Sequence, residues 1–404
     1  MMVPRTSLQR EVITYFAPCD PRQGMGGGAR VEQMMTAFER LGLHITVVSY
    51  DGSGDLGLTL GIVSRRAKIV KLGLPARVPK ILKSVAIPIL VLIGLAHTGK
   101  YPWVITHSPG VASGLIGLVV SQLRRGHLIV DLTDARDRDT PQAVYELVLR
   151  SASIVFAVSH RLERLAQSFG ARTVVYLPTF LDMSRYFRDD RERETTRTSL
   201  GLAQNNTVIG YFGSFARIEG LPTLLEAFSI VSKEEPDAKL LIVGSRNVEG
   251  TDDIERIIRD CHIGGSVLLL PPQAYVEIPK MLRAADLLVA PKIQAPENEV
   301  ADPIKIYEYL ASGTPCIISS IAEVAATAGK AEAAFIVEPG NIKALSQMIL
   351  HVLGHPELAH AYAARGRRLI ENSYSMERAS NLIRRTLADH VGPEPILEGD
   401  RVVA

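Results

Sequence analysis

Short aliphatic runs alternate with helix-like segments along most of this chain, and this alternation constrains the fold more than any other feature. In the first half, helical patterns such as Val31–Leu41 and Arg161–Phe169 lie between the runs. The strands predicted there are Val12–Phe16, Ile45–Ser49, Trp103–Thr106, Leu128–Leu132, Ile154–Val158 and Val174–Leu177. The pattern is typical of a doubly wound parallel sheet, because each parallel connection needs a crossover, usually a helix.

The alternation pauses at a charge-dense stretch, residues 185–206, which we interpret as an interdomain linker that is partly helical or disordered. It then restarts. The second set of predicted strands is Val208–Phe212, Lys239–Val243, Val267–Leu270, Leu287–Ala290, Cys316–Ser319 and Ala334–Val337. The sequence therefore predicts an α/β protein with two doubly wound, Rossmann-like domains, residues 1–184 and 207–372, facing each other across a cleft. Residues 391–404 are expected to form a flexible tail.

Bulk composition excludes several classes of protein. The 404 residues suffice for two cores, and the net charge of +2 gives no indication of nucleic-acid binding. The three cysteines, Cys19, Cys261 and Cys316, form neither a disulfide framework nor a C-x-x-C metal pair, which favours a reducing cytosol. The amino terminus lacks the apolar core of a signal peptide. We therefore expect a cytoplasmic location and no bound metal.

Positive charge is concentrated in one region. No Asp or Glu occurs between Asp55 and Asp131, whereas seven Lys or Arg residues lie within Arg65–Lys83. The apolar run Val85–Ala96 follows, and it is shorter than the roughly 20 residues that span a bilayer. We expect residues 65–96 to contact an anionic membrane at its inner face. The alternative is a buried core helix that follows a solvated basic face.

The segment Asp302–Ile317, DPIKIYEYLASGTPCI, has the layout of a ligand site at the end of a parallel strand. Lys305 and Glu308 are three residues apart near a helix start, where unpaired N–H groups, including that of Ile304, can bind phosphate. A carboxylate one turn into the helix can accept hydrogen bonds from two sugar hydroxyls. We predict a nucleotide site with Glu308 on the ribose and the loop on the diphosphate.

A second glycine-containing loop, residues 213–220 (GSFARIEG), follows another strand. Gly213 lets the backbone approach a diphosphate closely, with Ser214 beside it. Because the chain has no metal motif, the diphosphate needs cations, and we assign Arg217 and Lys305 to that role. A solvated Arg217 without function is the alternative.

The stretch Gly24–Ala29 contains G-x-G-x-x-A, a weak dinucleotide fingerprint. The preceding strand ends near Ala17, too far away for a tight strand-to-helix turn. We interpret the stretch as an acceptor or phosphate loop before a helix that starts at Val31. The residues of this loop are Gly26, Gly27, Gly28 and Arg30.

Polar residues follow two further strands. His107 comes after Trp103–Thr106, and Asp131, Asp134 and Asp137 follow the next strand. One of the carboxylates could bind an acceptor hydroxyl or act as its base, and we favour Asp134. The alternatives are a structural histidine and simple helix capping.

In order and spacing, these segments resemble retaining GT-B glycosyltransferases of family 4. Asp302–Ile317 is similar to the P-x-K-x-x-E-Y-x-A-x-G-x-P donor signature, and Tyr211–Phe228 to the first strand–loop–helix of the donor domain. The resemblance also includes Lys239–Gly244, Ala284–Pro291, Gly24–Arg30 and Thr106–Pro109. It departs from the family at Ser214 and Glu219, where many members carry basic residues, and at Val300, where a second glutamate is common.

The resemblance implies transfer of a sugar from a nucleoside diphosphate sugar to a hydroxyl acceptor, with retention and without a metal or cofactor. It places the donor in the carboxy-terminal domain and the acceptor, a membrane-associated or lipid-linked saccharide, in the amino-terminal one. It puts His107 near the donor sugar and carries a last helix, residues 373–390, back to the first domain. Two alternatives remain: an NAD(P)-dependent oxidoreductase or nucleotide-sugar epimerase, and a degenerate, non-catalytic GT-B membrane partner.

Overall fold

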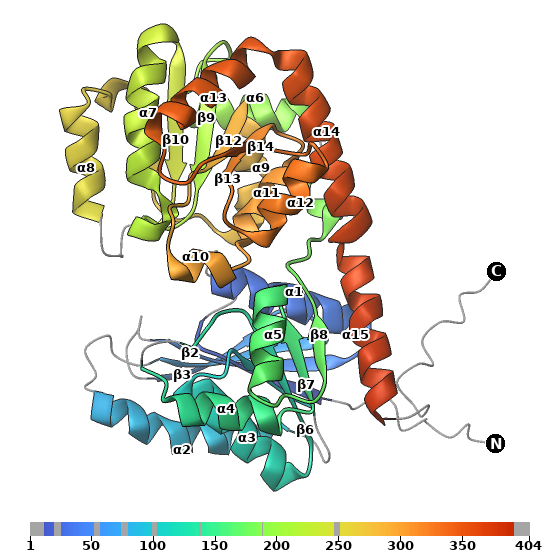
Figure 1. Cartoon of the computed structure of the whole chain (residues 1–404). Helices are drawn as coiled ribbons and strands as arrows, with labels where there is room; N and C mark the ends of the chain where they lie inside the picture. Colours follow the sequence, from blue (N-terminus) through green and yellow to red (C-terminus); the bar gives the residue numbers. More distant parts are fainter. Residues whose placement is uncertain are drawn as a thin grey trace, which may run out of the picture. The chain divides into compact units, whose positions relative to one another are not determined.

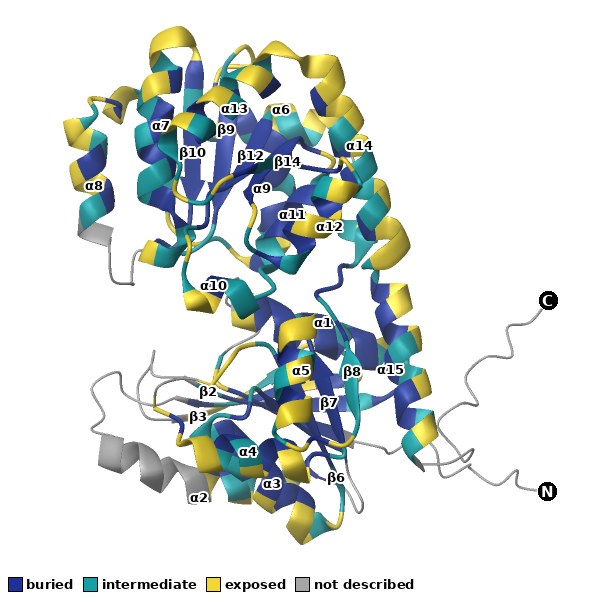
Figure 2. Ribbon diagram, in the orientation of Figure 1, coloured by how far each residue is buried: buried dark blue, intermediate teal, exposed yellow. Residues whose placement is uncertain are grey.

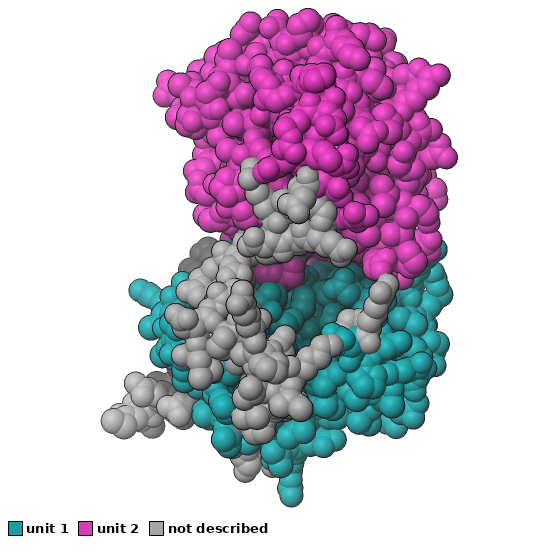
Figure 3. Space-filling model, turned by 90° about the vertical axis from the view of Figure 1, so that its left-hand side faces the viewer, with its two compact units in different colours: residues 1–21, 30–178, 376–404 teal, residues 22–29, 179–375 magenta. Residues whose placement is uncertain are grey.

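The computed structural model describes residues 12–19, 26–51, 57–73, 80–98, 103–136, 139–187, 189–245 and 251–391 (Figure 1). Its internal contacts divide the chain into two units (Figure 3). Unit 1 comprises Met1–Pro21, Arg30–Pro178 and Met376–Ala404, and unit 2 comprises Arg22–Ala29 and Thr179–Ser375. Each unit is organised around its own sheet.

The sheet of unit 1 has eight strands in the order β3-β4-β2-β1-β5-β6-β7-β8. All neighbouring strands are parallel except the edge pair β3 and β4, which is antiparallel. The strands are β1 Val12–Ala17, β2 His44–Asp51, β3 Gly57–Ile62, β4 Ala67–Gly73, β5 Trp103–His107, β6 His127–Leu132, β7 Ile154–Ala157 and β8 Val174–Tyr176.

The central strands of this sheet are buried on both faces (Figure 2), which explains why they read as continuous aliphatic runs. The helices that follow unit 1 strands are α2 Lys80–His97, α3 Val111–Arg124, α4 Gln142–Ser151 and α5 His160–Ser168. Helix α1 spans Gly26–Arg40, and the chain returns to this unit with α15, Met376–Val391.

The sheet of unit 2 has six parallel strands in the order β11-β10-β9-β12-β13-β14. They are β9 Thr207–Phe212, β10 Ala238–Val243, β11 Val267–Leu270, β12 Leu287–Ala290, β13 Cys316–Ser319 and β14 Phe335–Val337. The helices are α6 Asp190–Ser199, α7 Leu221–Glu234, α8 Thr251–Asp260, α9 Ile278–Ala284, α10 Pro296–Val300, α11 Ile304–Ser312, α12 Glu323–Lys330, α13 Ile342–Gly354 and α14 Pro356–Ser373.

Successive side chains of the unit 2 strands pack alternately into two separate hydrophobic cores, one on each face of the sheet. Leu288 packs in the core that contains α9 and α11, whereas its neighbours Leu287 and Val289 pack with α7 and α13. This is the period of two expected of a strand that is covered on both sides. The predicted pair of doubly wound sheets is therefore confirmed.

The structure corrects one local expectation and adds to two others. Helix α1 begins at Gly26 rather than Val31. Its first turn therefore consists mainly of glycines, which a helix tolerates better at its start than in its interior, since the first N–H groups make no bond within the helix in any case. The stretch 185–206, expected to be a partly helical or disordered linker, does contain a helix, α6, and it belongs to unit 2, where Arg197 is buried. Its guanidinium is satisfied by Asp286 and by the carbonyl groups of Ala284, Gln204 and Asn206. Strands β3 and β4 were not predicted at all.

Candidate functional site

In unit 2 the strand order reverses between β9 and β12, and two loops leave the sheet at this point. Strand β9 ends at Phe212 and leads into residues 213–220, and β12 ends at Ala290 and leads into residues 291–303. In open α/β sheets, ligands bind beyond the carboxyl ends of the strands at such a switch point. Both loops predicted to hold a diphosphate therefore start where unit 2 is expected to bind a ligand.

The ammonium group of Lys305 lies directly against Gly213. A Cβ atom on residue 213 would lie 2.6 Å from Nζ of Lys305, so glycine leaves the room that this group occupies. Nζ also lies 3.4 Å from the hydroxyl of Tyr211 and 4.8 Å from the centre of its ring. Because Lys305 is the second residue of α11, a phosphate at this helix start would meet N–H groups and a cation together.

Glu219 joins Lys305 to a second lysine. Its carboxylate accepts a hydrogen bond from Nζ of Lys292 at 2.9 Å and another from Nζ of Lys305. Burial by itself would raise the pKa of Glu219, but the charges of Lys305 and Lys292 outweigh it and lower the pKa to about 2. Two ammonium groups share one carboxylate, so the cluster keeps a surplus positive charge.

Lys292 is a site residue that the sequence analysis missed. It is 4% exposed, and its Nζ also donates to Oδ1 of Asn298 at 2.7 Å. Asn298 in turn donates to the carbonyl oxygens of Ile218 and Ile293, one from each loop. The available signal was a lysine placed directly after the buried strand β12 and Pro291.

The two loops also meet through their backbones at Gly220. The φ of Gly220 is +73°, in the left-handed region, and a Cβ atom there would lie 1.8 Å from the carbonyl oxygen of Pro291. Ile293 N donates to the carbonyl oxygen of Ile218 at 3.2 Å close by. Only glycine meets the conformational and the spatial requirement at once.

Glu308 lies one turn into α11, and its carboxylate is buried. Oε1 accepts a hydrogen bond from the hydroxyl of Tyr186 at 3.2 Å. Burial and, after it, the charge of Glu308 raise the pKa of Tyr186 well above its ordinary value, so the phenol remains a donor to the carboxylate. The predicted bond from Glu308 to a ribose remains a prediction.

The start of α11 is fixed by Asp302. Its Oδ1 accepts from the hydroxyl of Tyr307 at 2.7 Å, and its Oδ2 accepts from the backbone N–H of Thr179 at 3.0 Å. Ile304, the first helical residue, follows Pro303. The N–H groups of Ile304 and Lys305 have no acceptor within the helix, as the predicted phosphate contact requires, whereas that of Ile306 donates to the carbonyl oxygen of Pro303 at 3.0 Å.

Neither Arg217 nor Ser214 places a positive charge next to Gly213. The side chain of Arg217 is 69% exposed and pairs with Asp253 at 3.1 Å. The carbonyl oxygen of Ser214 accepts from the hydroxyl of Tyr211 at 2.6 Å. The structure thus brings Lys305, rather than Arg217, to the glycine of this loop.

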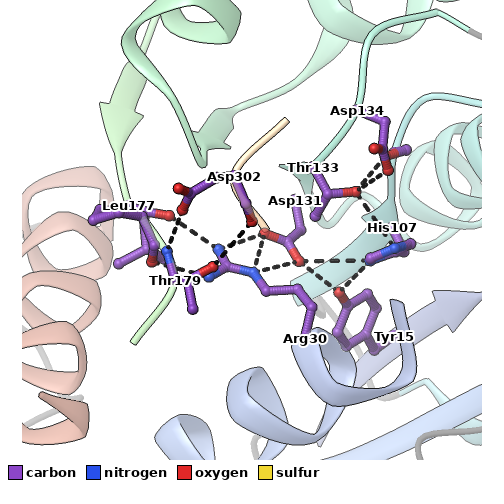
Figure 4. Close-up of polar contacts among 11 residues, drawn as sticks. Tyr15, Arg30, His107, Asp131, Thr133, Asp134, Leu177, Thr179 and Asp302 are labelled. Atoms are coloured by element: carbon purple, nitrogen blue, oxygen red, sulfur yellow. Dashed lines mark hydrogen bonds and ion pairs between the residues drawn. The ribbon is translucent and has the colours of Figure 1, made fainter. Parts of the chain in front are cut away.

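In unit 1 the strand order reverses between β1 and β5, and His107 is the last residue of β5. The imidazole is buried, and its Nδ1 lies 3.1 Å from the hydroxyl of Tyr15 in β1 (Figure 4). That hydroxyl donates to Oδ2 of Asp131 in β6 at 2.7 Å. Three adjacent strands therefore bring these side chains together at the switch point of unit 1.

Asp131 is completely buried, and Arg30 is its counter-ion (Figure 4). Nη2 of Arg30 donates to Oδ1 at 2.8 Å, and Nε lies 3.1 Å from the same oxygen. Burial alone would raise the pKa of Asp131, but the charge of Arg30 and the hydrogen bonds from His107 and Arg30 hold it well below the usual range. The predicted anion-binding role of Arg30 has no support here, because its guanidinium also donates to the carbonyl oxygens of Leu177 and Pro178.

Asp134 is connected to His107 only indirectly in the part of the chain that is described. Oγ1 of Thr133 donates to Oδ2 of Asp134 at 2.9 Å and lies 3.4 Å from Nε2 of His107. The hydroxyl of Ser108, a residue with a left-handed φ of 54°, lies 2.9 Å from that of Thr133. Asp137 lies outside the described residues.

The glycine run lies apart from any strand-to-helix turn. Gly26, Gly27 and Gly28 form the first turn of α1, whereas β1 ends at Ala17. A dinucleotide site needs its glycines directly after the strand, so this placement gives no support to the oxidoreductase alternative. Among the described residues, no group of three or more His, Cys, Asp or Glu side chains could hold a metal ion.

Two protein-family models match the chain. The model described as glycosyl transferases group 1 matches residues 192–369, and the one described as a glycosyl transferase 4-like domain matches residues 25–179. The first match spans both loops and the Lys305–Glu308 helix of unit 2. The second spans His107, Asp131 and Arg30.

One curated relative is the GDP-mannose-dependent monoacylated alpha-(1-6)-phosphatidylinositol monomannoside mannosyltransferase of Corynebacterium glutamicum, which is 27% identical over 228 residues. That match covers 55% of this chain, and the chain spans 58% of the relative's length. Among solved structures, sucrose-phosphate synthase from Thermosynechococcus elongatus superposes with a TM-score of 0.77 at 20% identity, covering 94% of this chain and 100% of that one. Anabaena HepE in complex with UDP-glucose superposes with a TM-score of 0.73 at 17% identity, covering 94% and 99%. These likenesses establish the fold.

Proposed function

Because the chain belongs to the group 1 glycosyl transferases of GT-B fold, we propose that it transfers a sugar from a nucleoside diphosphate sugar to a hydroxyl group of a saccharide or lipid-linked acceptor. Unit 2 is assigned the donor and unit 1 the acceptor. The observation that carries the proposal is the position of Lys305, which belongs to the first turn of α11 and whose ammonium group lies against Gly213. Anabaena HepE, of similar fold, has been solved with UDP-glucose.

In the proposed donor complex, the diphosphate lies at the start of α11. The N–H groups of Ile304 and Lys305, the ammonium group of Lys305 and the backbone at Gly213 bind its oxygens. Glu308 accepts hydrogen bonds from the ribose hydroxyls. The surplus positive charge of the Lys292–Glu219–Lys305 cluster stabilises the departing diphosphate without a metal ion.

We propose that transfer proceeds with retention of the anomeric configuration. The bond from the anomeric carbon to the diphosphate oxygen breaks, and the acceptor oxygen forms its new bond on the same face of the sugar. The acceptor's hydroxyl proton passes to the departing phosphate oxygen, so no separate base is consumed. His107 binds a sugar hydroxyl during this step, and Asp134 binds the acceptor.

The acceptor is proposed to lie at a membrane surface, and unit 1 has a face that suits such a surface. Leu58, Leu60 and Ile62 of edge strand β3 are 62%, 63% and 75% exposed. Ile89 and Leu92 of α2 are exposed as well. We call these five residues the β3–α2 face.

The strand register puts these side chains on one side of the sheet. Leu60 pairs with Val70, Val70 with Val48, and Val48 with Phe16. Directly paired residues project from the same face, and Phe16 contacts α2 at Gly94. The exposed positions of β3 therefore lie on the side of the sheet that α2 covers.

Cations border this apolar surface. Lys68 is paired with Ile62 and is exposed, as are Arg65 and Arg66 in the turn between β3 and β4. Aliphatic side chains beside lysines and arginines match the chemistry of an anionic lipid surface. Within the described residues, no helix is long and apolar enough to cross a bilayer. The contact that we propose is a peripheral one.

The donor assignment is tested by the change Glu308→Gln together with a matched control. Thermal-shift titration with UDP-, GDP-, ADP- and TDP-sugars identifies the base, because a bound ligand raises the melting temperature. We expect Glu308→Gln to weaken binding of that ligand about tenfold or more, through loss of a charge-assisted hydrogen bond to the ribose. The exposed change Glu234→Gln on α7 should have no effect. Unchanged affinity in the Glu308 variant would refute the site.

A further inference from the structure

The single proton of the Tyr15 hydroxyl determines which nitrogen of His107 carries a proton. Asp131 is ionised beside Arg30 and can only accept, and its Oδ2 lies 2.7 Å from the Tyr15 oxygen. The phenol proton therefore points to Asp131. The Tyr15 oxygen is left as an acceptor toward Nδ1 of His107 at 3.1 Å, so Nδ1 has to be the donor.

A proton on Nδ1 leaves the lone pair of the neutral imidazole on Nε2. In the described part of the chain, the hydrogen-bond contact of Nε2 is with Oγ1 of Thr133 at 3.4 Å, which is long for such a bond. The Thr133 proton is already directed to Asp134 at 2.9 Å. Nε2 is therefore an acceptor that receives no short hydrogen bond from these residues.

We propose that Tyr15 and Asp131 are positioning residues that hold His107 in the Nδ1–H form, so that Nε2 accepts a hydrogen bond from a hydroxyl group of the sugar substrate. The sugar as ligand rests on the proposed function. Arg30 belongs to the same device because it keeps Asp131 ionised within a buried site. A carboxylate that fixes the tautomer of a histidine is a known means of orienting a reactive ring nitrogen.

The proposal concerns the partners of the His107 ring and leaves the predicted role of Asp134 toward the acceptor as it stands. The charged or titratable groups around His107 are Tyr15 on β1, Asp131 on β6, Arg30 behind Asp131 and Asp134 behind Thr133. Of these, the Tyr15 hydroxyl lies nearest to the imidazole, at 3.1 Å from Nδ1, and Oδ2 of Asp131 lies 3.7 Å from the same nitrogen. Tyr15→Phe therefore removes the hydroxyl that lies between Asp131 and His107, and it leaves the Asp131–Arg30 ion pair in place.

The test is the protonation state of the ring, read by NMR of protein labelled with ring-¹⁵N histidine. The chain has ten histidines, so the signal that disappears in His107→Gln assigns His107. We expect the neutral ring of the unmodified protein to carry its proton on Nδ1. We expect Tyr15→Phe to shift the two ring-nitrogen signals toward each other as the second tautomer becomes populated. A neutral His107 with its proton on Nε2 would overturn the proposal without any variant.

Tyr50→Phe is the matched control. Tyr50 lies in β2 of the same sheet, and its hydroxyl is hydrogen-bonded to Ser113. The control loses one phenol hydroxyl, as Tyr15→Phe does, and should leave the His107 signals in place. An equal shift in both variants would indicate a general packing change and would also overturn the proposal.

A double-variant cycle links the tautomer to turnover. We expect Tyr15→Phe and His107→Gln each to lower kcat/KM about tenfold or more, and Tyr15→Phe to have little further effect in the His107→Gln background. Independent, multiplicative losses would show that Tyr15 does not act through His107. If no donor supports sugar transfer, the proposed function fails with its sugar ligand, while the tautomer measurement still decides the role of Tyr15.

Discussion

Nζ of Lys292 donates a 2.9 Å hydrogen bond to the carboxylate of Glu219, and the lysine comes from the loop after β12 while the glutamate comes from the loop after β9. Many members of the family that the sequence resembles carry a lysine at the position of Glu219. In this chain the acidic residue at that position is compensated by a buried lysine from the neighbouring loop. The Lys292–Glu219 pair is neutral by itself, so Lys305, the second lysine on this carboxylate, leaves the three-residue cluster with a net positive charge at the switch point.

The Glu219 network makes a prediction about stability and pH. The folded-state pKa of about 2 lies below the ordinary value of 4.5, so the stabilisation is complete above about pH 4.5 and is lost as pH falls toward 2. We expect Glu219→Gln to lower the free energy of unfolding by about 3 kcal/mol at pH 7 and by much less at pH 3. Urea unfolding at both pH values measures this, with Glu234→Gln as the exposed control. An equal loss at both pH values would contradict the prediction.

Two cationic side chains of the donor region should differ in their effect on nucleotide binding. Lys305→Met should weaken binding of a nucleoside diphosphate about 10- to 100-fold, because a charged hydrogen bond in a half-buried site is lost. Arg217→Met should change it less than about threefold, since this guanidinium is exposed and pairs with Asp253. Isothermal titration with the diphosphate and with the bare nucleoside separates the two effects. Nucleoside affinity should be the same in all variants, and a larger effect of Arg217 would reverse the assignment.

Gly220→Ala, with Gly340→Ala as its control, tests the contact between Gly220 and the carbonyl group of Pro291. Both have a left-handed φ, of +73° and +72°, but a Cβ on Gly220 would meet the Pro291 carbonyl, whereas nothing lies within 4 Å of one on Gly340. Gly340→Ala should cost about 1 kcal/mol of conformational strain, and Gly220→Ala about 2 kcal/mol or more beyond that. Denaturant midpoints of the two variants give the difference. Equal costs would mean that the loops relax around the new methyl group.

Binding to lipid vesicles tests the β3–α2 face. Leu60→Ser combined with Ile62→Ser should reduce flotation with anionic vesicles, and Lys68→Gln should reduce it most at low ionic strength. Val276→Ser in unit 2 is the control, because that side chain is 67% exposed and lies in the other unit. Neutral vesicles should bind less than anionic ones. Flotation that is unchanged in the β3 variants would exclude this face as the membrane contact.

The sheets could be predicted from sequence because their strands are buried on both faces. Runs such as Leu287–Ala290 contain only aliphatic residues and stand between clear helical patterns. Strands β3 and β4 lack that signal, since β3 is an edge strand with exposed leucines and β4 carries lysines among its buried residues. Helix α6 was expected only as part of a partly helical or disordered linker, because no local pattern shows that Arg197 is buried and bonded to the distant Ala284.

The sequence allowed individual residues of the candidate site to be predicted, but not their contact partners. Sequence motifs led to Gly213, Lys305, Glu308 and His107, which the structure places at or just beyond strand ends or on the adjoining helix. The partners of these residues come from distant parts of the chain: Glu219 reaches Lys292, and Tyr15 reaches Asp131. No local pattern shows such pairings, because they depend on which strands become neighbours.

Strand β3 is the outermost strand at one edge of its sheet, and aliphatic side chains are exposed at alternate positions along it. An open edge of this kind is a ready template for a strand from another molecule. When the protein is purified away from lipid, we expect concentrated samples to self-associate through this edge, and mild detergent or Leu60→Lys to return them to monomers. The size of the particle in solution would then depend on how the sample was handled.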